Sequence, residues 1–219
     1  MIKGVIFDLD GTLLDTLDDI HNVVNKVLRL NNLPTKTVPE VKAAVGRGVT
    51  ELVRKLFPSG ELSAQRVKKV ASDIREIFLE HGTVLTKPYT GVEEMLDTFA
   101  GRGIPMAVLT NKPQASAEKA VSVYLPDVPF RTVQGAMPGF PIKPEAEIAV
   151  KVILKLGTLP EETLMVGDSD VDMDTAKNAG LIAVGVSWGF RPVELLLDHG
   201  ADVIVNDPME ICGLIRIHR

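Results

Sequence analysis

The chain is poor in cysteine, in aromatic residues and in basic charge. A single cysteine, Cys212, excludes an internal disulfide and any metal site built from a Cys-x-x-Cys pair. Aromatic residues make up 5% of the 219 residues, too few to favour stacking platforms for single-stranded nucleic acid. The formal net charge of -5 offers no basic field for phosphate backbones or anionic lipid, so we expect neither nucleic acid nor a membrane as a partner.

Long hydrophobic runs are also missing, although 45% of the residues are apolar. No run approaches the roughly 20 residues that a helix needs to span a bilayer. The first residues lead straight into a predicted strand, without the pattern of a cleavable signal. These features predict a globular cytoplasmic protein, and they leave its oligomeric state open.

Short apolar runs alternate with helical patterns over most of the chain. Each run has the length of a strand, and its near-continuous apolarity predicts burial on both faces, as in a parallel sheet. The runs lie at residues 5–7, 106–109, 164–166, 183–186 and 203–205. Helical patterns lie between them, for example at 148–156 and 192–199. The alternation predicts an α/β fold with a doubly wound, Rossmann-like parallel sheet.

Residues 17–82 show a different pattern of apolar and polar residues, which contains no convincing strand. One helix is predicted to open after Thr16, with Asp19 completing its N-terminal cap. Another is predicted to start near Ser63 and to stop at Gly82. We therefore expect an α-helical cap domain at 17–82, inserted into an α/β core formed by residues 1–16 and 83–219.

Acidic residues cluster where two of the predicted strands end, which is where open α/β sheets bind ligands. Asp8 and Asp10 follow the first strand and would share one side of an extended chain. Asp168 and Asp172 follow the strand at 164–166. Carboxylates this close repel one another unless one is protonated or a cation lies between them, and Mg²⁺ suits oxygen ligands. Solvated turns and helix capping are the alternative explanations.

Hydrogen-bond donors are found at further junctions between predicted elements. Thr110 and Asn111 follow the strand that ends at 109, and Lys143 precedes the helix at 148–156. Gly11 lets the backbone turn sharply and approach a ligand. Such donors beside carboxylates are the parts needed for metal-assisted phosphoryl transfer. A solvated surface charge is the alternative explanation of Lys143.

Four stretches of the sequence together resemble the haloacid dehalogenase-like hydrolase superfamily. They are DLDGTLLDT from Asp8, VLTNKP with Thr110, PIKP with Lys143, and GDSDVDMDTAKNAG from Gly167. They occur in order, and the resemblance covers essentially the whole chain. Within the superfamily the chain looks most like phosphoglycolate phosphatases, through stretches such as VGRGVTELV, KPYTGV and VSWGF. It departs from the KPxP pattern of many relatives at Ala146.

The resemblance implies a Mg²⁺-dependent phosphatase of small phosphomonoesters, with 2-phosphoglycolate as the expected substrate. Asp8 would be the nucleophile that forms an aspartyl-phosphate, and Asp10 the general acid and base. Mg²⁺ would be held by Asp8, the main-chain carbonyl of Asp10 and Asp168, and Asp172 would orient a metal-bound water.

The resemblance also implies which groups hold the substrate. The phosphoryl oxygens would be bound by Gly11, Thr110, Asn111 and Lys143. In the predicted cap, Arg47 between two glycines is the expected specificity residue, facing a substrate carboxylate. A helix C-cap followed by a solvated arginine is the alternative there. Lys112 is a second candidate for the carboxylate, although a surface position is favoured for it.

Several other functions stay open at this point. An inorganic pyrophosphatase, a sugar-phosphate phosphatase or a phosphosugar mutase would share the mechanism and differ in the shape of the cap. A receiver-like signalling module also carries a phosphorylatable aspartate and a lysine, but it needs neither the helical insert nor an acid at Asp10. That acid also favours a phosphatase over a dehalogenase, because a halide leaves without a proton. A binding protein on a retired enzyme scaffold would have lost some of these residues, and none is lost.

Overall fold

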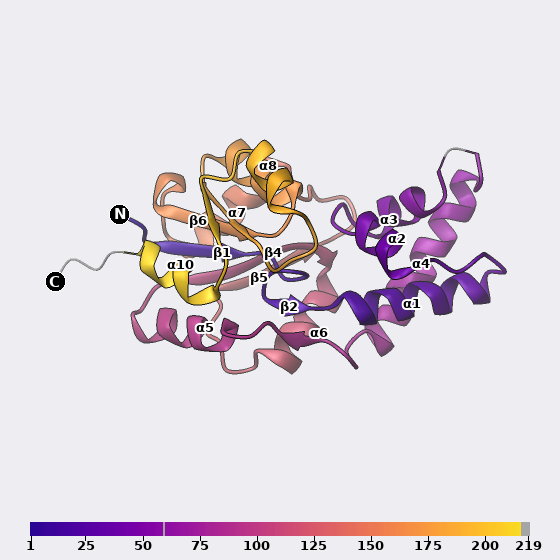
Figure 1. The fold of residues 1–219 in the computed structure, drawn as a ribbon, viewed down its shortest axis with the longest axis horizontal. Helices are drawn as coiled ribbons and strands as arrows, with labels where there is room; N and C mark the ends of the chain where they lie inside the picture. The colour runs from indigo at the N-terminus through magenta and orange to yellow at the C-terminus, as the bar shows by residue number, and fades with distance from the viewer. Residues whose placement is uncertain (59, 216–219) are drawn as a thin grey trace.

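The computed structural model describes residues 1–58 and 60–215 and contains a six-stranded sheet (Figure 1). Its strands are β1 (Gly4–Phe7), β4 (Met106–Pro113), β5 (Thr132–Ala136), β6 (Thr163–Gly167), β7 (Ile182–Val186) and β8 (Val203–Val205). Their order is β5-β4-β1-β6-β7-β8, and all neighbouring strands are parallel. The predicted α/β fold with a Rossmann-like parallel sheet is confirmed, although the sequence pattern does not predict β5.

Helices cover both faces of the sheet (Figure 1). One face carries α5 (Val92–Gly101), α6 (Gln114–Tyr124) and α10 (Pro208–Leu214), and the other carries α7 (Ala146–Leu156), α8 (Asp170–Ala179) and α9 (Val193–Asp198). A short 3-10 helix at Pro160–Glu162 leads into β6. Within the part of the chain that the structure describes, no helix combines the length and the apolar composition of a membrane span.

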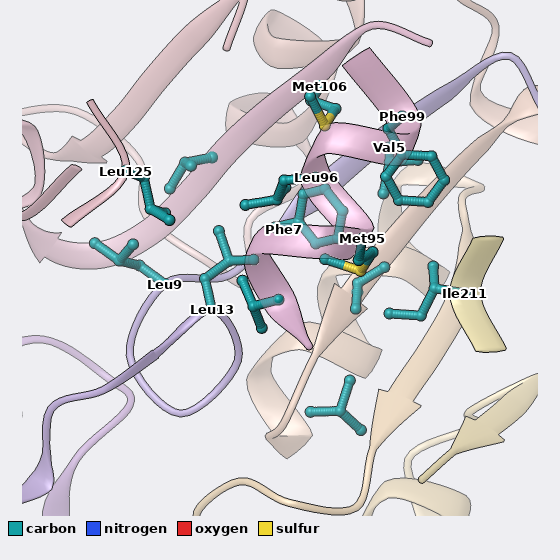
Figure 2. Close-up of a cluster of buried hydrophobic side chains, with 14 of the residues drawn as sticks. Val5, Phe7, Leu9, Leu13, Met95, Leu96, Phe99, Met106, Leu125 and Ile211 are labelled. Carbon is teal, nitrogen blue, oxygen red and sulfur yellow. The ribbon is translucent and has the colours of Figure 1, made fainter. Parts of the chain in front are cut away.

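The core under α5 and α10 fixes the central strand β1 (Figure 2). All residues of β1 are buried, and the ring of Phe7 lies 6.1 Å from the ring of Phe99 in α5. Cys212 is buried in the same cluster. Burying such aromatic side chains contributes roughly 1.5–3 kcal/mol each, so the end of β1 is held firmly. Asp8 is the next residue.

Beyond the strand ends lies a bundle of α1 (Leu17–Leu30), α2 (Val38–Ala44), α3 (Val49–Leu56) and α4 (Ala64–His81), called the cap below (Figure 1). The cap has its own hydrophobic cluster, formed by the apolar faces of these helices. The predicted start of α4 is confirmed, because the side chain of Ser63 accepts a hydrogen bond from Arg66 N at 3.2 Å. The predicted domain limits at residues 17 and 82 stay a prediction.

Two short strands, β2 (Leu14–Asp15) and β3 (Lys87–Pro88), join the core to the cap as an antiparallel pair. Helix α1 opens after Thr16 as predicted, but the Thr16 side chain makes no capping hydrogen bond among the described residues. Asp19 is buried and accepts hydrogen bonds from the backbone N–H groups of residues 84–86. Its carboxylate therefore ties the start of α1 to the returning chain.

Candidate active site

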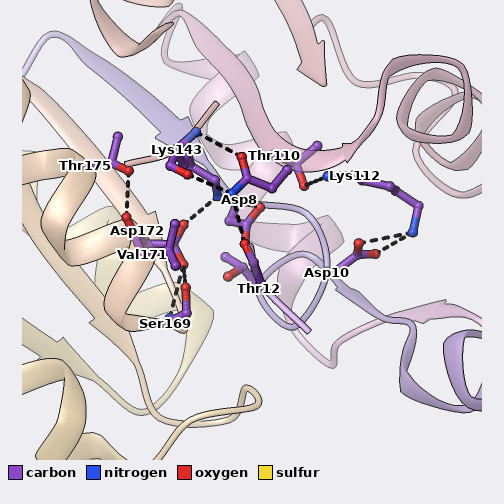
Figure 3. A network of polar contacts seen from close by, with 12 residues as sticks. Asp8, Asp10, Thr12, Thr110, Lys112, Lys143, Ser169, Val171, Asp172 and Thr175 are labelled. Atoms are coloured by element: carbon purple, nitrogen blue, oxygen red, sulfur yellow. Dashed lines mark hydrogen bonds and ion pairs between the residues drawn. The ribbon is translucent and has the colours of Figure 1, made fainter. Parts of the chain in front are cut away.

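The strand ends bring the predicted acids and donors together (Figure 3). This edge of the sheet faces the cap (Figure 1). Asp8 follows β1, Thr110 lies in the last part of β4, and Asp168 follows β6. All three side chains are buried. Since β1 lies between β4 and β6, these residues meet in space although more than fifty residues separate any two of them in sequence.

Lys143 lies between two carboxylates of this group. Its Nζ is 2.9 Å from Asp8 Oδ1 and 2.6 Å from Asp172 Oδ1. The residue is only 3% exposed, so the explanation of Lys143 as a solvated surface charge is wrong. Burial alone would lower the pKa of this ammonium, but Asp172 and Asp8 raise it above its ordinary value. A buried cation therefore lies directly beside the predicted nucleophile.

Asp168 is held by backbone and side-chain donors and by two close glycines. Its Oδ2 accepts a hydrogen bond from Phe190 N at 2.7 Å, and its Oδ1 accepts one from Thr12 Oγ1 at 3.3 Å. A Cβ atom at Gly11, where φ is +87°, would lie 2.5 Å from Asp168 Oδ2. At Gly189 a Cβ would lie 2.2 Å from Asp168 Cβ. Sequence reasoning misses Gly189, because its closeness to Asp168 exists only in the folded chain.

Asp172 does two things at once. Its Oδ2 accepts hydrogen bonds from Ser169 N and Ser169 Oγ, which caps the start of α8 as the capping explanation predicts. Its Oδ1 contacts Lys143, and the residue is fully buried. A Cβ atom at Gly167 would lie 2.2 Å from Asp172 Cγ, so this approach also requires glycine. Asp172 therefore caps α8 and at the same time belongs to the acid cluster.

The buried acids suit a divalent cation. Asp8, Asp168 and Asp172 each offer a carboxylate oxygen, and these atoms lie within 4.8 Å of one another. Burial, and next the charge of Asp172, raise the pKa of Asp8 to about 7 and that of Asp168 to about 8. Lys143 is the one cation paired with this cluster among the described residues, which leaves negative charge in excess. Oxygen ligands of this kind fit Mg²⁺.

We expect Mg²⁺ to raise the melting temperature by several degrees at about pH 8 and by less at about pH 6. The pKa values of Asp8 and Asp168 lie above those of an unfolded chain, so the metal-free fold loses stability as the pH rises from about 4 past about 8. Mg²⁺ binds the ionised carboxylates and competes with protons. Thermal unfolding with and without Mg²⁺ at both pH values measures this effect, and Asp168→Asn should abolish it. Equal shifts at both pH values would contradict the expectation.

Asp10 points away from the acid cluster (Figure 3). The strand ends at Phe7, so the extended chain that would put Asp8 and Asp10 on one side is not present. Both Asp10 carboxylate oxygens instead contact Lys112 Nζ, at 2.8 and 3.1 Å. The favoured surface position of Lys112 is also wrong, because the residue is 8% exposed and its ammonium lies 4.1 Å from the ring centroid of Phe78 in α4.

A cavity of about 780 Å³, part of it open to solvent, lies between the strand ends and the cap. On the core side it is lined by polar groups, among them Asp8, Asp10, Thr110, Asn111, Lys112 and Asp168. The cap contributes mainly apolar side chains: Ile20, Val24, Val45, Val49, Leu52, Ile74 and Phe78. The polar groups at the strand ends thus face an apolar wall formed by the cap.

Arg47 is not among the described residues that line this cavity. Its Nη2 donates a hydrogen bond to Asp170 Oδ2 at 2.7 Å, so the arginine joins the cap to α8. The core residue Arg191 also reaches the cap, where it donates to the carbonyls of Lys42 and Val45. The geometry therefore gives Arg47 a contact between cap and core, and it does not support the predicted carboxylate contact. No local signal joins Arg47 to a partner 123 residues away.

Asn111 faces the cavity, but its amide group is already used. Nδ2 donates to the carbonyls of Gly46 and Lys143, both at 2.9 Å, and Oδ1 accepts from Lys143 N at 2.9 Å. An amide nitrogen has two donors, so neither is free for a phosphoryl oxygen. The predicted phosphate contact of Asn111 is not supported by this arrangement. The residue holds the backbone of Lys143 in place and contacts the cap.

Comparison with known proteins gives a consistent picture. The sequence profile of "Haloacid dehalogenase-like hydrolase" matches residues 5–186. A phosphoglycolate phosphatase of Chromobacterium violaceum is 31% identical over 98% of this chain and 97% of its own. An N-acetylmuramic acid 6-phosphate phosphatase of Pseudomonas aeruginosa is 28% identical over 98% and 95%.

Solved structures share the whole fold. A crystal structure from Lactobacillus delbrueckii subsp. bulgaricus, named as a candidate phosphoglycolate phosphatase, superposes with a TM-score of 0.89 at 26% identity, over 99% of each chain. The profile match covers every strand of the sheet up to β7 and all four motifs that carry the site. The chain belongs to the haloacid dehalogenase-like hydrolase family.

Proposed function

We propose that this protein is a Mg²⁺-dependent phosphatase that hydrolyses small phosphomonoesters through an aspartyl-phosphate on Asp8. Asp8 lines the cavity, and the pairing of its carboxylate with a buried lysine 2.9 Å away carries this proposal. A carboxylate nucleophile attacks an anionic phosphoryl group only where nearby positive charge offsets the repulsion. Lys143 supplies that charge, and the acid cluster provides ligands for a metal.

Different residues carry out the separate steps of the proposed reaction. A carboxylate oxygen of Asp8 forms a bond to phosphorus while the ester bond breaks, and Asp10 gives a proton to the leaving alkoxide. Asp10 then takes a proton from the water that attacks phosphorus, which releases inorganic phosphate and restores Asp8. Thr110 and Lys143 hold the phosphoryl oxygens, together with backbone groups near Gly11.

The proposed metal ligands are Asp8, Asp168 and the main-chain carbonyl of Asp10. When bound, Mg²⁺ supplies Lewis-acid stabilisation of the charge on the transferred phosphoryl group. Asp172 keeps Lys143 in place through the 2.6 Å contact and lies beside both acidic ligands. Its buried position suits the predicted role in orienting a metal-bound water, which stays a proposal.

We propose 2-phosphoglycolate as the substrate. The name of the Chromobacterium violaceum relative supports this substrate, since it names phosphoglycolate. The cavity brings Asp8, Asp10 and Lys112 around one space, which suits a compact leaving group beside the phosphoryl group. Pyrophosphate and sugar phosphates are the alternatives that the same reacting groups would accept.

Phosphate release from a panel of substrates tests the proposed function. The panel contains 2-phosphoglycolate, ethyl phosphate, p-nitrophenyl phosphate, sugar phosphates and pyrophosphate, each with and without Mg²⁺. We expect the esters to be hydrolysed only when Mg²⁺ is present. Acid quenching should trap one phosphoryl group on the peptide that contains Asp8. No release from any ester would overturn the proposal. A long-lived phosphoprotein without turnover would favour a receiver-like module instead.

A further inference from the structure

The described lining of the cavity holds one buried cation on the side of Asp10. The side chain of Lys112 is 4% exposed and reaches into the cavity from the end of β4. The other lining cations have partners elsewhere. Arg191 donates to backbone carbonyls of the cap, and Arg75 is exposed and donates to Thr50 Oγ1 at 2.8 Å. Lys112 is therefore the buried cation of this lining that lies nearest to Asp10.

Lys112 also lies at the right place along the substrate. The proposed role of Asp10 requires the ester oxygen to lie against its carboxylate. Lys112 Nζ is 2.8 and 3.1 Å from the two oxygens of that carboxylate. An anionic oxygen about three bonds beyond the ester oxygen thus falls within hydrogen-bond reach of the ammonium. In 2-phosphoglycolate a single methylene separates the ester oxygen from the carboxylate.

The surroundings of Lys112 strengthen such a contact. The ammonium has three donors, of which Asp10 occupies two, while the ring of Phe78 lies 4.1 Å from it. The cap wall around Phe78 is apolar, so the two ions of a pair formed there attract each other more strongly than in bulk water. A substrate carboxylate that takes Lys112 also leaves the Asp10 side chain free to face the ester oxygen.

We propose that Lys112 is the specificity-determining residue for the leaving group: its ammonium exchanges the Asp10 carboxylate for a carboxylate of the substrate. This inference rests on the proposed phosphatase function. It assigns carboxylate recognition to the end of β4 in the core, and it leaves Arg47 with its contact to Asp170.

The selectivity between a charged and a neutral leaving group tests the proposal. Lys112→Met should lower the ratio of kcat/KM for 2-phosphoglycolate to that for ethyl phosphate by about 10- to 100-fold, as expected for a lost charge-assisted hydrogen bond. Lys112→Gln should also lower this ratio of kcat/KM values. Arg47→Met is the matched control and should leave the ratio within about twofold. A ratio that falls for Arg47→Met and not for Lys112→Met overturns the proposal.

Binding measured in an inactive background separates recognition from chemistry. In Asp8→Asn protein with Mg²⁺, calorimetry should show that Lys112→Met raises the Kd of 2-phosphoglycolate by about 10- to 100-fold and changes that of ethyl phosphate little. Equal weakening of both ligands, or no binding of 2-phosphoglycolate before the change, overturns the role of Lys112. Failure of the proposed function has a different signature, namely that wild-type protein releases phosphate from neither ester.

Discussion

Replacement of Asp8 by asparagine is expected to lower phosphate release by about 10⁴-fold or more, as for other essential nucleophiles. An amide does not form the aspartyl-phosphate, so the first step of the reaction is lost. Asparagine has nearly the shape of aspartate, and Lys143 keeps its 2.6 Å contact with Asp172, so the fold should persist. Steady-state release from p-nitrophenyl phosphate with Mg²⁺ measures the loss, and acid-quenched protein should carry no phosphoryl group.

Two controls accompany this variant. Asp174→Asn makes the same chemical change in α8, where Asp174 contacts His199 at 2.8 Å, and its rate should stay within about twofold of wild type. Without Mg²⁺ at about pH 8, Asp8→Asn should melt no lower than wild type, because it removes a buried carboxylate whose pKa is raised to about 7. If the Asp8→Asn protein is folded and keeps about a tenth of the wild-type rate, Asp8 is not the nucleophile.

The sequence predicts the sheet and its acidic edge for a simple reason. Apolar runs mark buried parallel strands, and the carboxyl ends of parallel strands meet at one edge. Residues directly after such runs, such as Asp8 and Asp168, are therefore expected to lie close together on the strength of the pattern alone. The pattern of apolar runs does not predict β5, because its residues TVQGA mix polar and small side chains. This strand joins the sheet by pairing with β4.

The contacts that a side chain makes after a turn cannot be predicted from the pattern of apolar runs. Strand alternation applies only while the chain is extended, and here it ends before Asp8. The turn that follows closes on Leu9 O, which accepts the backbone N–H groups of Leu13 and Leu14 at 3.1 and 2.9 Å. This turn sends Asp10 toward Lys112, a contact between residues 102 positions apart that no local pattern encodes.

Loss of Lys143 should reduce phosphate release by about 10³-fold, comparable to the loss of one key donor to a transition state. Lys143→Met removes the cation that contacts Asp8 at 2.9 Å and would hold the phosphoryl oxygens. It also leaves two buried carboxylates without their partner, which costs about 3–5 kcal/mol of unfolding free energy. Rates are compared with 2-phosphoglycolate and p-nitrophenyl phosphate at saturating Mg²⁺, and stability by urea unfolding.

A double variant separates the two roles of Lys143. Adding Asp172→Asn to Lys143→Met removes one unpaired buried carboxylate, so part of the lost stability should return. Activity should not return with it, because no lysine ammonium then faces the phosphoryl group. Asp172→Asn alone should reduce activity by only about tenfold, since Lys143 still contacts Asp8. If activity recovered together with stability, Lys143 would serve only to neutralise the buried acids, and the phosphoryl group would have to be stabilised by Thr110, the backbone and Mg²⁺ alone.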